Sequence, residues 1–141
     1  MRSMVFFIGW ILCSCSSHYV TVDRYAVLPS ELPSVYIDSP DPMKANPTQG
    51  QVLDVSYSIK ALEKKKMPYL LLLKVIYKNL EEETLSYTVF NEKGGFEFSV
   101  LDEKFLATGG VLTYKAELMT FDGDPIAEYK HKLWFDLISF D

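Results

Sequence analysis

The chain has 141 residues and a formal net charge of −5, and 48% of its residues are hydrophobic. This length fits one domain that can bury a core. Nucleic-acid binding and electrostatic membrane anchoring need a basic surface or a polybasic segment, and the acidic balance argues against both. Aromatic residues make up 14% of the chain and favour strands over helices, because their side chains suit a pleated surface.

The first residues have the layout of an export signal. Arg2 is followed by an apolar run over Met4–Leu12 and then by small residues and a cysteine. A membrane-spanning helix needs about 20 apolar residues, whereas the apolar core of a signal peptide has about 7–15. We therefore expect a cleaved signal, with an uncleaved anchor as the alternative.

The stretch Leu12-Cys13-Ser14-Cys15 resembles the lipobox of bacterial lipoproteins. Leu12 matches its −3 position, Ser14 the small residue at −1 and Cys15 the obligatory cysteine at +1, while Cys13 is a less usual residue at the permissive −2 position. The resemblance implies that residues 1–14 are a lipoprotein signal peptide cleaved before Cys15. It also implies that Cys15 carries a diacylglyceryl thioether and an N-acyl chain, which are covalent lipids and not a cofactor.

By this resemblance the lipid is the contact with the membrane. A single acyl chain, at about 0.8 kcal/mol per buried CH₂, binds only marginally, so durable anchoring needs two or three chains. In the same family Ser16 at +2 favours the outer membrane, which places the chain in the bacterial cell envelope. The alternative is an ordinary secretory signal. Cys13 and Cys15 are the only cysteines, so the exported domain must be stabilised by its core without a disulfide.

The rest of the chain divides into a tether and a domain. Residues 15–33 are expected to form the lipidated N-terminus and a tether, within which Ser16–Val27 alternates and is either a stalk or an edge strand. Residues 34–141 are expected to form the folded domain. Its first strand is expected at Ser34–Asp38, between prolines that disfavour a helix.

Alternating hydrophobic residues mark the middle of the domain. They predict a half-buried strand over Gln51–Ile59, followed by a charged loop over Lys60–Pro68. Tyr69–Lys78 is expected to be the central strand, because it carries apolar residues on both faces. One face presents Tyr69, Leu71, Leu73, Val75 and Tyr77, and the other presents Leu70, Leu72 and Ile76.

Turn signals separate the following strands. Asn79–Glu83 predicts a turn, and Asn91–Gly95 predicts a second one, because paired glycines supply the positive φ angles of tight turns. Leu101–Thr108 is expected to contain a short helical turn. The strands between these signals carry alternating apolar residues: Leu85, Tyr87 and Val89, then Phe96, Phe98 and Val100.

Gly109-Gly110 opens the clearest hairpin of the chain. Its two strands are expected to meet at the turn Asp122–Pro125. On the first strand the inward-facing residues are Leu112, Tyr114, Ala116 and Leu118, and on the second they are Tyr129, Leu133, Phe135 and Leu137.

About seven or eight strands spaced by turn signals predict an all-β fold, an antiparallel β-sandwich, after the N-terminal signal segment. The segment Thr108–Leu118 is similar to the penultimate strands of immunoglobulin-like and fibronectin-like domains, which often place a tyrosine and a small residue where Tyr114 and Ala116 stand. The chain has no Cys-Trp-Cys core, so the resemblance concerns the architecture alone.

Motifs for catalysis are missing from the sequence. It contains no nucleophile elbow, no H-E-x-x-H and no glycine-rich phosphate loop, so we expect no enzyme and no catalytic residue. His18 lies beside the proposed anchor, and His131 is expected to be a structural histidine. Two pairs of aspartates could supply oxygen ligands for calcium, namely Asp38 with Asp41 and Asp122 with Asp124. Turns use the same residue types, so we assign no metal site.

Four aromatic residues are candidates for a surface that binds a partner. They are Tyr36, Tyr69, Phe90 and Trp134. Together with the lipobox, they favour a lipid-anchored envelope lipoprotein that acts as a non-catalytic protein-binding or scaffolding module, with an envelope protein as its partner and no nucleic acid. The alternatives are a pilotin-like assembly lipoprotein for a secretion channel, a small glycan-binding protein and a small hydrolase.

Overall fold

The computed structural model describes residues 19–31, 47–59 and 68–135. These residues form seven strands, one short 3₁₀ helix and one short α-helix. Several sequence predictions lie outside the described residues, namely those for the signal and lipobox residues Leu12, Ser14 and Cys15, for Tyr36 and the strand at 34–38, for His18, Asp38 and Asp41, for the loop 60–67 and for Leu137.

One sheet has three antiparallel strands in the order β1-β2-β5. They are β1 (Tyr19–Val27), β2 (Gly50–Ser58) and β5 (Lys93–Leu101), and the short helix η1 (Pro29–Glu31) follows β1. β2 is the middle strand because it pairs with β1 on one side and with β5 on the other.

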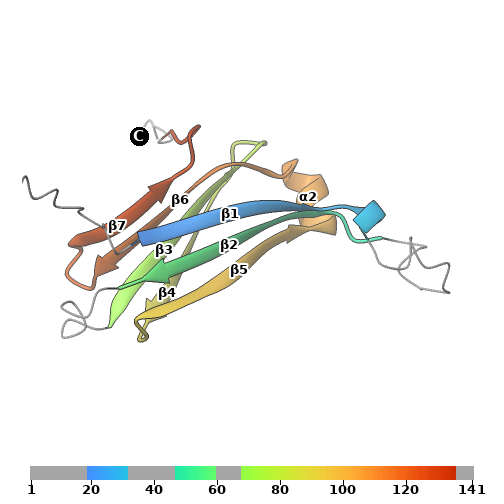
Figure 1. Cartoon of the computed structure of the whole chain (residues 1–141). Coiled ribbons are helices and arrows are strands. Elements are labelled where there is room, and N and C mark those ends of the chain that lie inside the picture. Colours follow the sequence, from blue (N-terminus) through green and yellow to red (C-terminus); the bar gives the residue numbers. More distant parts are fainter. Residues whose placement is uncertain (1–18, 32–46, 60–67, 136–141) are drawn as a thin grey trace, which may run out of the picture.

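The other sheet has four antiparallel strands in the order β4-β3-β6-β7. They are β3 (Tyr69–Tyr77), β4 (Glu82–Val89), β6 (Val111–Thr120) and β7 (Pro125–Lys130), and the helix α2 (Asp102–Thr108) joins β5 to β6. The two sheets lie face to face (Figure 1). The expected antiparallel β-sandwich is confirmed.

The core lies between the sheets, and β3 contributes most to it. Its inward residues Tyr69, Leu71, Leu73, Val75 and Tyr77 are all at most 2% exposed. Full burial of a side chain such as leucine or valine stabilises the fold by about 1.5–3 kcal/mol relative to its exposed state. The alternation in the sequence therefore identified a central strand correctly.

β1 corrects the expected boundary between tether and domain. It lies within residues 15–33, yet it pairs with β2 along its whole length, from Tyr19 opposite Ser58 to Val27 opposite Gly50. Val20 and Val22 are 3% and 2% exposed, so their alternation is that of a half-buried strand. Of the two alternatives for this segment, the edge strand is right, and the sandwich begins at Tyr19 and not at residue 34.

The paired glycines Gly94 and Gly95 are not in a tight turn. They lie inside β5, opposite Tyr57 and Ser56 of β2. A Cβ atom on Gly94 would lie 2.6 Å from the Tyr57 hydroxyl, and one on Gly95 would lie 2.5 Å from the Val55 carbonyl oxygen. These glycines are required because β2 approaches the backbone closely, which a sequence pattern does not distinguish from a turn.

The expected helical turn before the last hairpin is confirmed as α2. Gly109 ends this helix in the left-handed conformation, with φ 73°, as is common for a glycine after a helix. The pairing of β3 with β6 then shifts between Ile76 and Tyr77, so that Tyr77 faces Val111. Leu112 is the extra residue, and Val111 takes the core position that was expected for Leu112.

The last strand is shorter than the sequence predicts. β7 ends at Lys130, and although Tyr129 packs against the core, Leu133 and Phe135 are 62% and 40% exposed. The chain leaves the strand because Trp134 N–H donates to the His131 carbonyl, 2.9 Å away, and closes a turn. The prediction that Leu133 and Phe135 face inward is therefore wrong.

Candidate functional site

The two ends of the sandwich differ in what they expose. The near end is the one where β1 begins. The register places Tyr19 opposite Ser58 there, and Tyr69 beside Val89 and Thr120 in the other sheet, whose ends of β4 and β6 lie on the same side of the sandwich in Figure 1. The far end carries α2, η1 and the turn between β3 and β4 (Figure 1). Each strand therefore has one terminus at each end.

Three exposed apolar residues lie together at the near end, and we call them the rim patch: Pro68, Phe90 and Phe121. Tyr69 of β3 pairs with Val89 of β4 and with Thr120 of β6, so each member of the patch stands one residue beyond a paired position. Phe90 is 69% exposed and Phe121 60% exposed. Neighbouring strands are about 4.8 Å apart, so the patch spans about two strand spacings.

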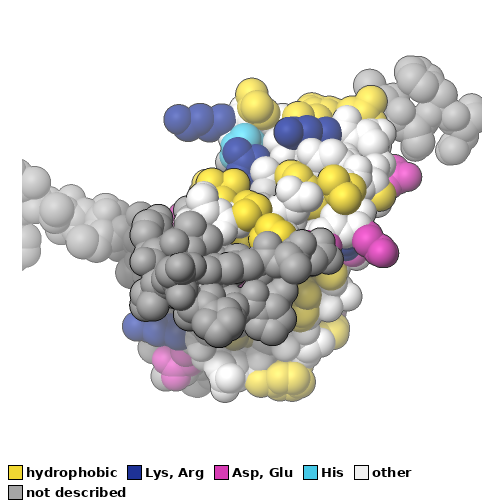
Figure 2. All heavy atoms as spheres, turned by 90° about the vertical axis from the view of Figure 1, so that its right-hand side faces the viewer, with side chains coloured by type: hydrophobic (Ala, Val, Ile, Leu, Met, Phe, Trp, Pro, Cys, Tyr) yellow, Lys and Arg dark blue, Asp and Glu magenta, His cyan; other side chains and the backbone are white. Residues whose placement is uncertain are grey.

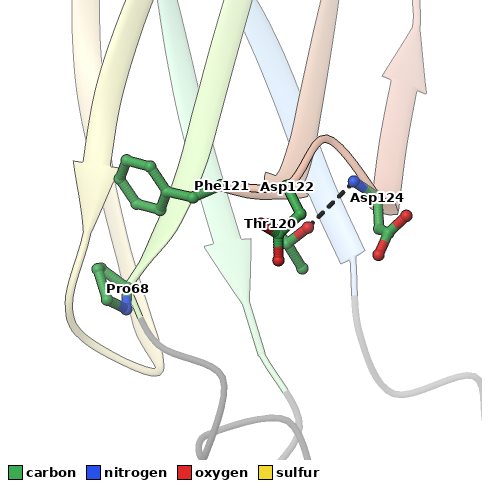
Figure 3. Close-up of a pocket in the computed structure, with 5 residues that line it drawn as sticks. All are labelled: Pro68, Thr120, Phe121, Asp122 and Asp124. Atoms are coloured by element: carbon green, nitrogen blue, oxygen red, sulfur yellow. Dashed lines mark hydrogen bonds between the residues drawn. The ribbon is translucent and has the colours of Figure 1, made fainter.

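A hollow of about 550 Å³ opens beside the rim patch. Figure 3 shows Pro68 and Phe121 on one side of it and Asp122 and Asp124 on the other, with Thr120 between them. The hollow thus joins an apolar wall to an acidic one.

The aspartates of the hollow belong to the turn between β6 and β7. Thr120 N–H donates to the Asp124 carbonyl at 2.9 Å, and Asp124 N–H donates to the Thr120 hydroxyl at 3.0 Å. Gly123 has φ +93°, which favours glycine. Among the described residues no three His, Cys, Asp or Glu side chains gather as a metal site would need. The contacts of the turn account for the position of Asp124.

The four aromatic residues chosen from the sequence do not form one surface. Tyr69 is fully buried, so its assignment to a partner surface is wrong; its position on the apolar face of β3 places it in the core. Phe90 is exposed in the rim patch. Trp134 is half-buried, with its ring centroid 5.8 Å from Lys115 Nζ. Tyr36 lies outside the described residues.

Pro68 and Phe121 were missed by the sequence reasoning. Each lies next to a strand that was predicted, Pro68 before Tyr69 and Phe121 before the Asp122–Pro125 turn. Only the pairing register of β3, β4 and β6 brings these residues to the same end as Phe90. The sequence of one strand does not reveal that register.

His131 makes structural contacts. Its ring centroid lies 4.9 Å from that of Tyr114, and its Nδ1 lies 3.4 Å from the Thr113 hydroxyl. Burial, with Arg24 and Lys132 nearby, holds the pKa of His131 below its ordinary value. The neutral imidazole is therefore favoured, as expected for a histidine that packs.

The far end contains a polar network of three side chains. The Tyr77 hydroxyl donates to Glu83 Oε2, and Lys104 Nζ lies 2.7 Å from the same oxygen. Burial raises the pKa of Glu83, but the hydrogen bonds from Lys104 and Tyr77 outweigh it and lower the pKa below its ordinary value. Burial and the bond to Glu83 raise the pKa of Tyr77. The network ties β3 and β4 to α2.

The far end also exposes large apolar side chains. Leu28, Leu80 and Leu106 are 48%, 60% and 68% exposed. Figure 2 looks onto this end and shows hydrophobic side chains on its surface. Apolar exposure alone therefore does not distinguish the two ends.

No protein family model, no curated protein sequence and no solved structure matches this chain. In the part of the chain that the structure describes, no helix is long and apolar enough to cross a membrane.

Proposed function

We propose that the chain is a lipid-anchored lipoprotein of the bacterial envelope that acts as a binding module and not as an enzyme, with the lipid on Cys15. The lipobox resemblance of Leu12, Ser14 and Cys15 supports the anchor. β1 starts at Tyr19, so the folded domain follows Cys15 with almost no tether between them. The outer membrane is the proposed location, from Ser16 at +2.

The resemblance to immunoglobulin-like and fibronectin-like domains stays a prediction. It is supported by the two packed antiparallel sheets and by β6, the penultimate strand, on which Tyr114 and Ala116 are 4% and 0% exposed. Domains with this architecture serve many functions, so the architecture does not choose the partner.

The observation that carries the binding function is a row of three carboxylates across the outer face of the three-stranded sheet, which we call the acidic row: Asp23, Asp54 and Glu97. Asp23 pairs with Asp54, and Asp54 pairs with Glu97. Like charges directly opposite each other on paired strands are destabilising, although Glu97 also accepts a hydrogen bond from the Tyr25 hydroxyl at 3.1 Å. The acidic row destabilises the sheet, and binding of a basic partner protein to this face explains why the row is present.

The anchor is tested by labelling cells with an alkyne analogue of palmitate. Cys15→Ser should lose the label and accumulate as unprocessed precursor. Cys13→Ser is the matched control and should be labelled and processed normally, because the −2 position of a lipobox is permissive. A labelled and matured Cys15→Ser variant would contradict the anchor.

The binding function is tested by retrieving the tagged full-length protein from cross-linked envelopes. The variant with Asp23→Asn, Asp54→Asn and Glu97→Gln should lose a stoichiometric partner protein that the wild type retains at low salt. The control variant with Glu82→Gln, Glu103→Gln and Asp122→Asn has the same change in charge and should keep it. Equal retention by both variants would remove the acidic row from the interface, and binding to glycan columns would favour the glycan-binding alternative.

A further inference from the structure

The rim patch continues onto the outer face of the four-stranded sheet. Leu70 and Met119 are paired there, on the opposite face from the buried Tyr69 and Leu118, and both are half-buried. Met119 stands two residues before Phe121, with Leu70 beside it, whereas the residue paired with Leu70 on β4 is the exposed Thr88. Exposed apolar side chains gathered at one end mark a contact with another molecule or with a membrane.

The chain between the proposed anchor and β1 is short. Four residue steps separate Cys15 from Tyr19. A fully extended chain spans at most about 3.6 Å per residue, so the start of β1 lies within about 14 Å of Cys15. The near end is therefore held close to whatever surface the lipid on Cys15 enters.

The far end is held away from that surface. β1 has nine residues and a strand rises about 3.3 Å per residue, so its last residue, Val27, lies about 26 Å from its first. Leu80 and Leu106 are exposed as strongly as Phe90 and Phe121, but they lie at this distant end. The position of the anchor thus distinguishes two apolar surfaces that exposure does not.

We propose that the rim patch is a second membrane contact, in which Phe90 and Phe121 enter the lipid interface beside the lipid on Cys15. This inference rests on the proposed lipid anchor. Aromatic and leucine side chains enter the boundary between headgroups and acyl chains to a depth of about 5–10 Å. The two contacts together hold the sandwich upright, with the near end on the membrane and the far end in water.

The charges around the patch define the kind of lipid surface. Asp122 and Asp124 lie on the opposite side of the hollow from Phe121 (Figure 3). Carboxylates favour neither burial among acyl chains nor an anionic surface. The contact is therefore apolar, requires no anionic lipid and is insensitive to salt.

The experiment uses the processed full-length protein in phosphatidylcholine vesicles. The variants Phe90→Cys, Phe121→Cys and Leu106→Cys each carry one nitrobenzoxadiazole label, since the sulfur of Cys15 is blocked by the lipid and Cys13 is removed with the signal. Leu106 is the matched control, because its exposure of 68% is close to the 69% of Phe90. Mass spectrometry first establishes whether Cys15 carries its lipid, and thermal unfolding establishes that each variant is folded.

The expected result is a blue-shifted emission at positions 90 and 121, unchanged by 0.5 M salt, with several-fold stronger quenching by doxyl-labelled phospholipids than at position 106. Equal, water-like emission at all three positions on a lipidated protein overturns the membrane contact and leaves the anchor standing. Blue-shifted labels that doxyl lipids do not quench also overturn it, because a protein then covers the patch. A protein without lipid on Cys15 overturns the anchor and the contact together.

Discussion

The near end and the far end of the sandwich are built from the termini of the same strands, but the described residues make different contacts there. At the far end α2 and its flanking residues contact both sheets, whereas at the near end Ile59 N–H donates to the Glu92 carbonyl at 2.7 Å within one sheet. Asp102 N–H donates to the Gln49 carbonyl, Asn79 N–H donates to the Thr108 carbonyl, and Lys104 contacts Glu83 at the far end. At the near end the turn between β6 and β7 is closed by its own backbone, and the rim patch lies open beside it. The comparison indicates that the far end contributes to stability and that the near end is available for contact.

The largest loss of unfolding free energy is expected from a charged residue in β3, which runs from the near end to the far end. Leu71→Asp places a charge at a fully buried position of β3 and should cost about 5 kcal/mol or more, comparable with the whole stability of a small domain. Urea unfolding followed by circular dichroism measures this loss. Leu72→Asp lies on the outer, half-buried face and should cost much less. Equal losses would contradict the assignment of the two faces of β3.

The next effect compares two glycines with nearly the same backbone angle. Gly110 at the far end has φ +90° and Gly123 at the near end has φ +93°. A Cβ atom on Gly110 would lie 2.7 Å from Phe105 Cε2 and 2.9 Å from Gln51 Oε1, whereas one on Gly123 would meet nothing within 4 Å. Gln51 Oε1 also accepts a hydrogen bond from Val111 N–H.

Both alanine variants should lose about 1–2 kcal/mol from the left-handed conformation, and Gly110→Ala should lose about 0.5–1.5 kcal/mol more with the hydrogen bond of Gln51. Chemical denaturation of the two variants side by side measures the difference. If Gly123→Ala is the more destabilised of the two, the contrast between the two ends is wrong.

These glycines also show how far the sequence could predict the fold. The alternation of apolar residues predicted β2, β3, β5 and β6, because each has one face on the core. Gly94 and Gly95 were misread as a turn, since the close approach of Tyr57 depends on a strand distant in sequence. The bulge at Leu112 has the same origin, because it exists only in the pairing of β6 with β3.

The site was less predictable than the fold. The sequence predicted both Phe90 and Tyr69 as part of a partner surface. Phe90 is exposed, but Tyr69 lies on the apolar face of β3 and is a core residue. Phe121 and Pro68 join Phe90 only through the register of three strands. The acidic row likewise depends on which residues of β1, β2 and β5 stand opposite each other. Contacts between strands depend on how distant segments pair, so they cannot be predicted from the local pattern of a single sequence.

A smaller effect concerns the pH dependence of the far end. The pKa of Glu83 is lowered in the folded state, so its ionised form stabilises the fold fully above its unfolded pKa of about 4.3. This contribution is lost as the pH falls through the folded value. Glu83→Gln should therefore flatten the fall of the unfolding free energy below about pH 4, as measured by urea unfolding at several pH values.

Lys104→Met removes a partner of Glu83 and should flatten the same part of the pH profile. The double variant with Glu83→Gln should then add little, because both single changes remove one ion pair. Fully additive effects would contradict the network between β4 and α2.

The smallest effect is expected at the rim patch. Phe90→Ser and Phe121→Ser should each change the unfolding free energy by no more than about 0.5 kcal/mol, because both side chains are largely exposed. Thermal unfolding of the protein in the absence of membranes checks this, with Leu106→Ser as the far-end control. A large loss would mean that the phenylalanines serve the fold, and it would contradict a patch that is available for contact.

The central claim is that the near end is placed at a membrane by a lipid on Cys15, and mass spectrometry of the N-terminal peptide of the mature protein tests it most directly. We expect a chain that begins at Cys15 and carries a diacylglyceryl group and an N-acyl chain. A mature chain that begins at another residue, or that has an unmodified Cys15, would contradict it.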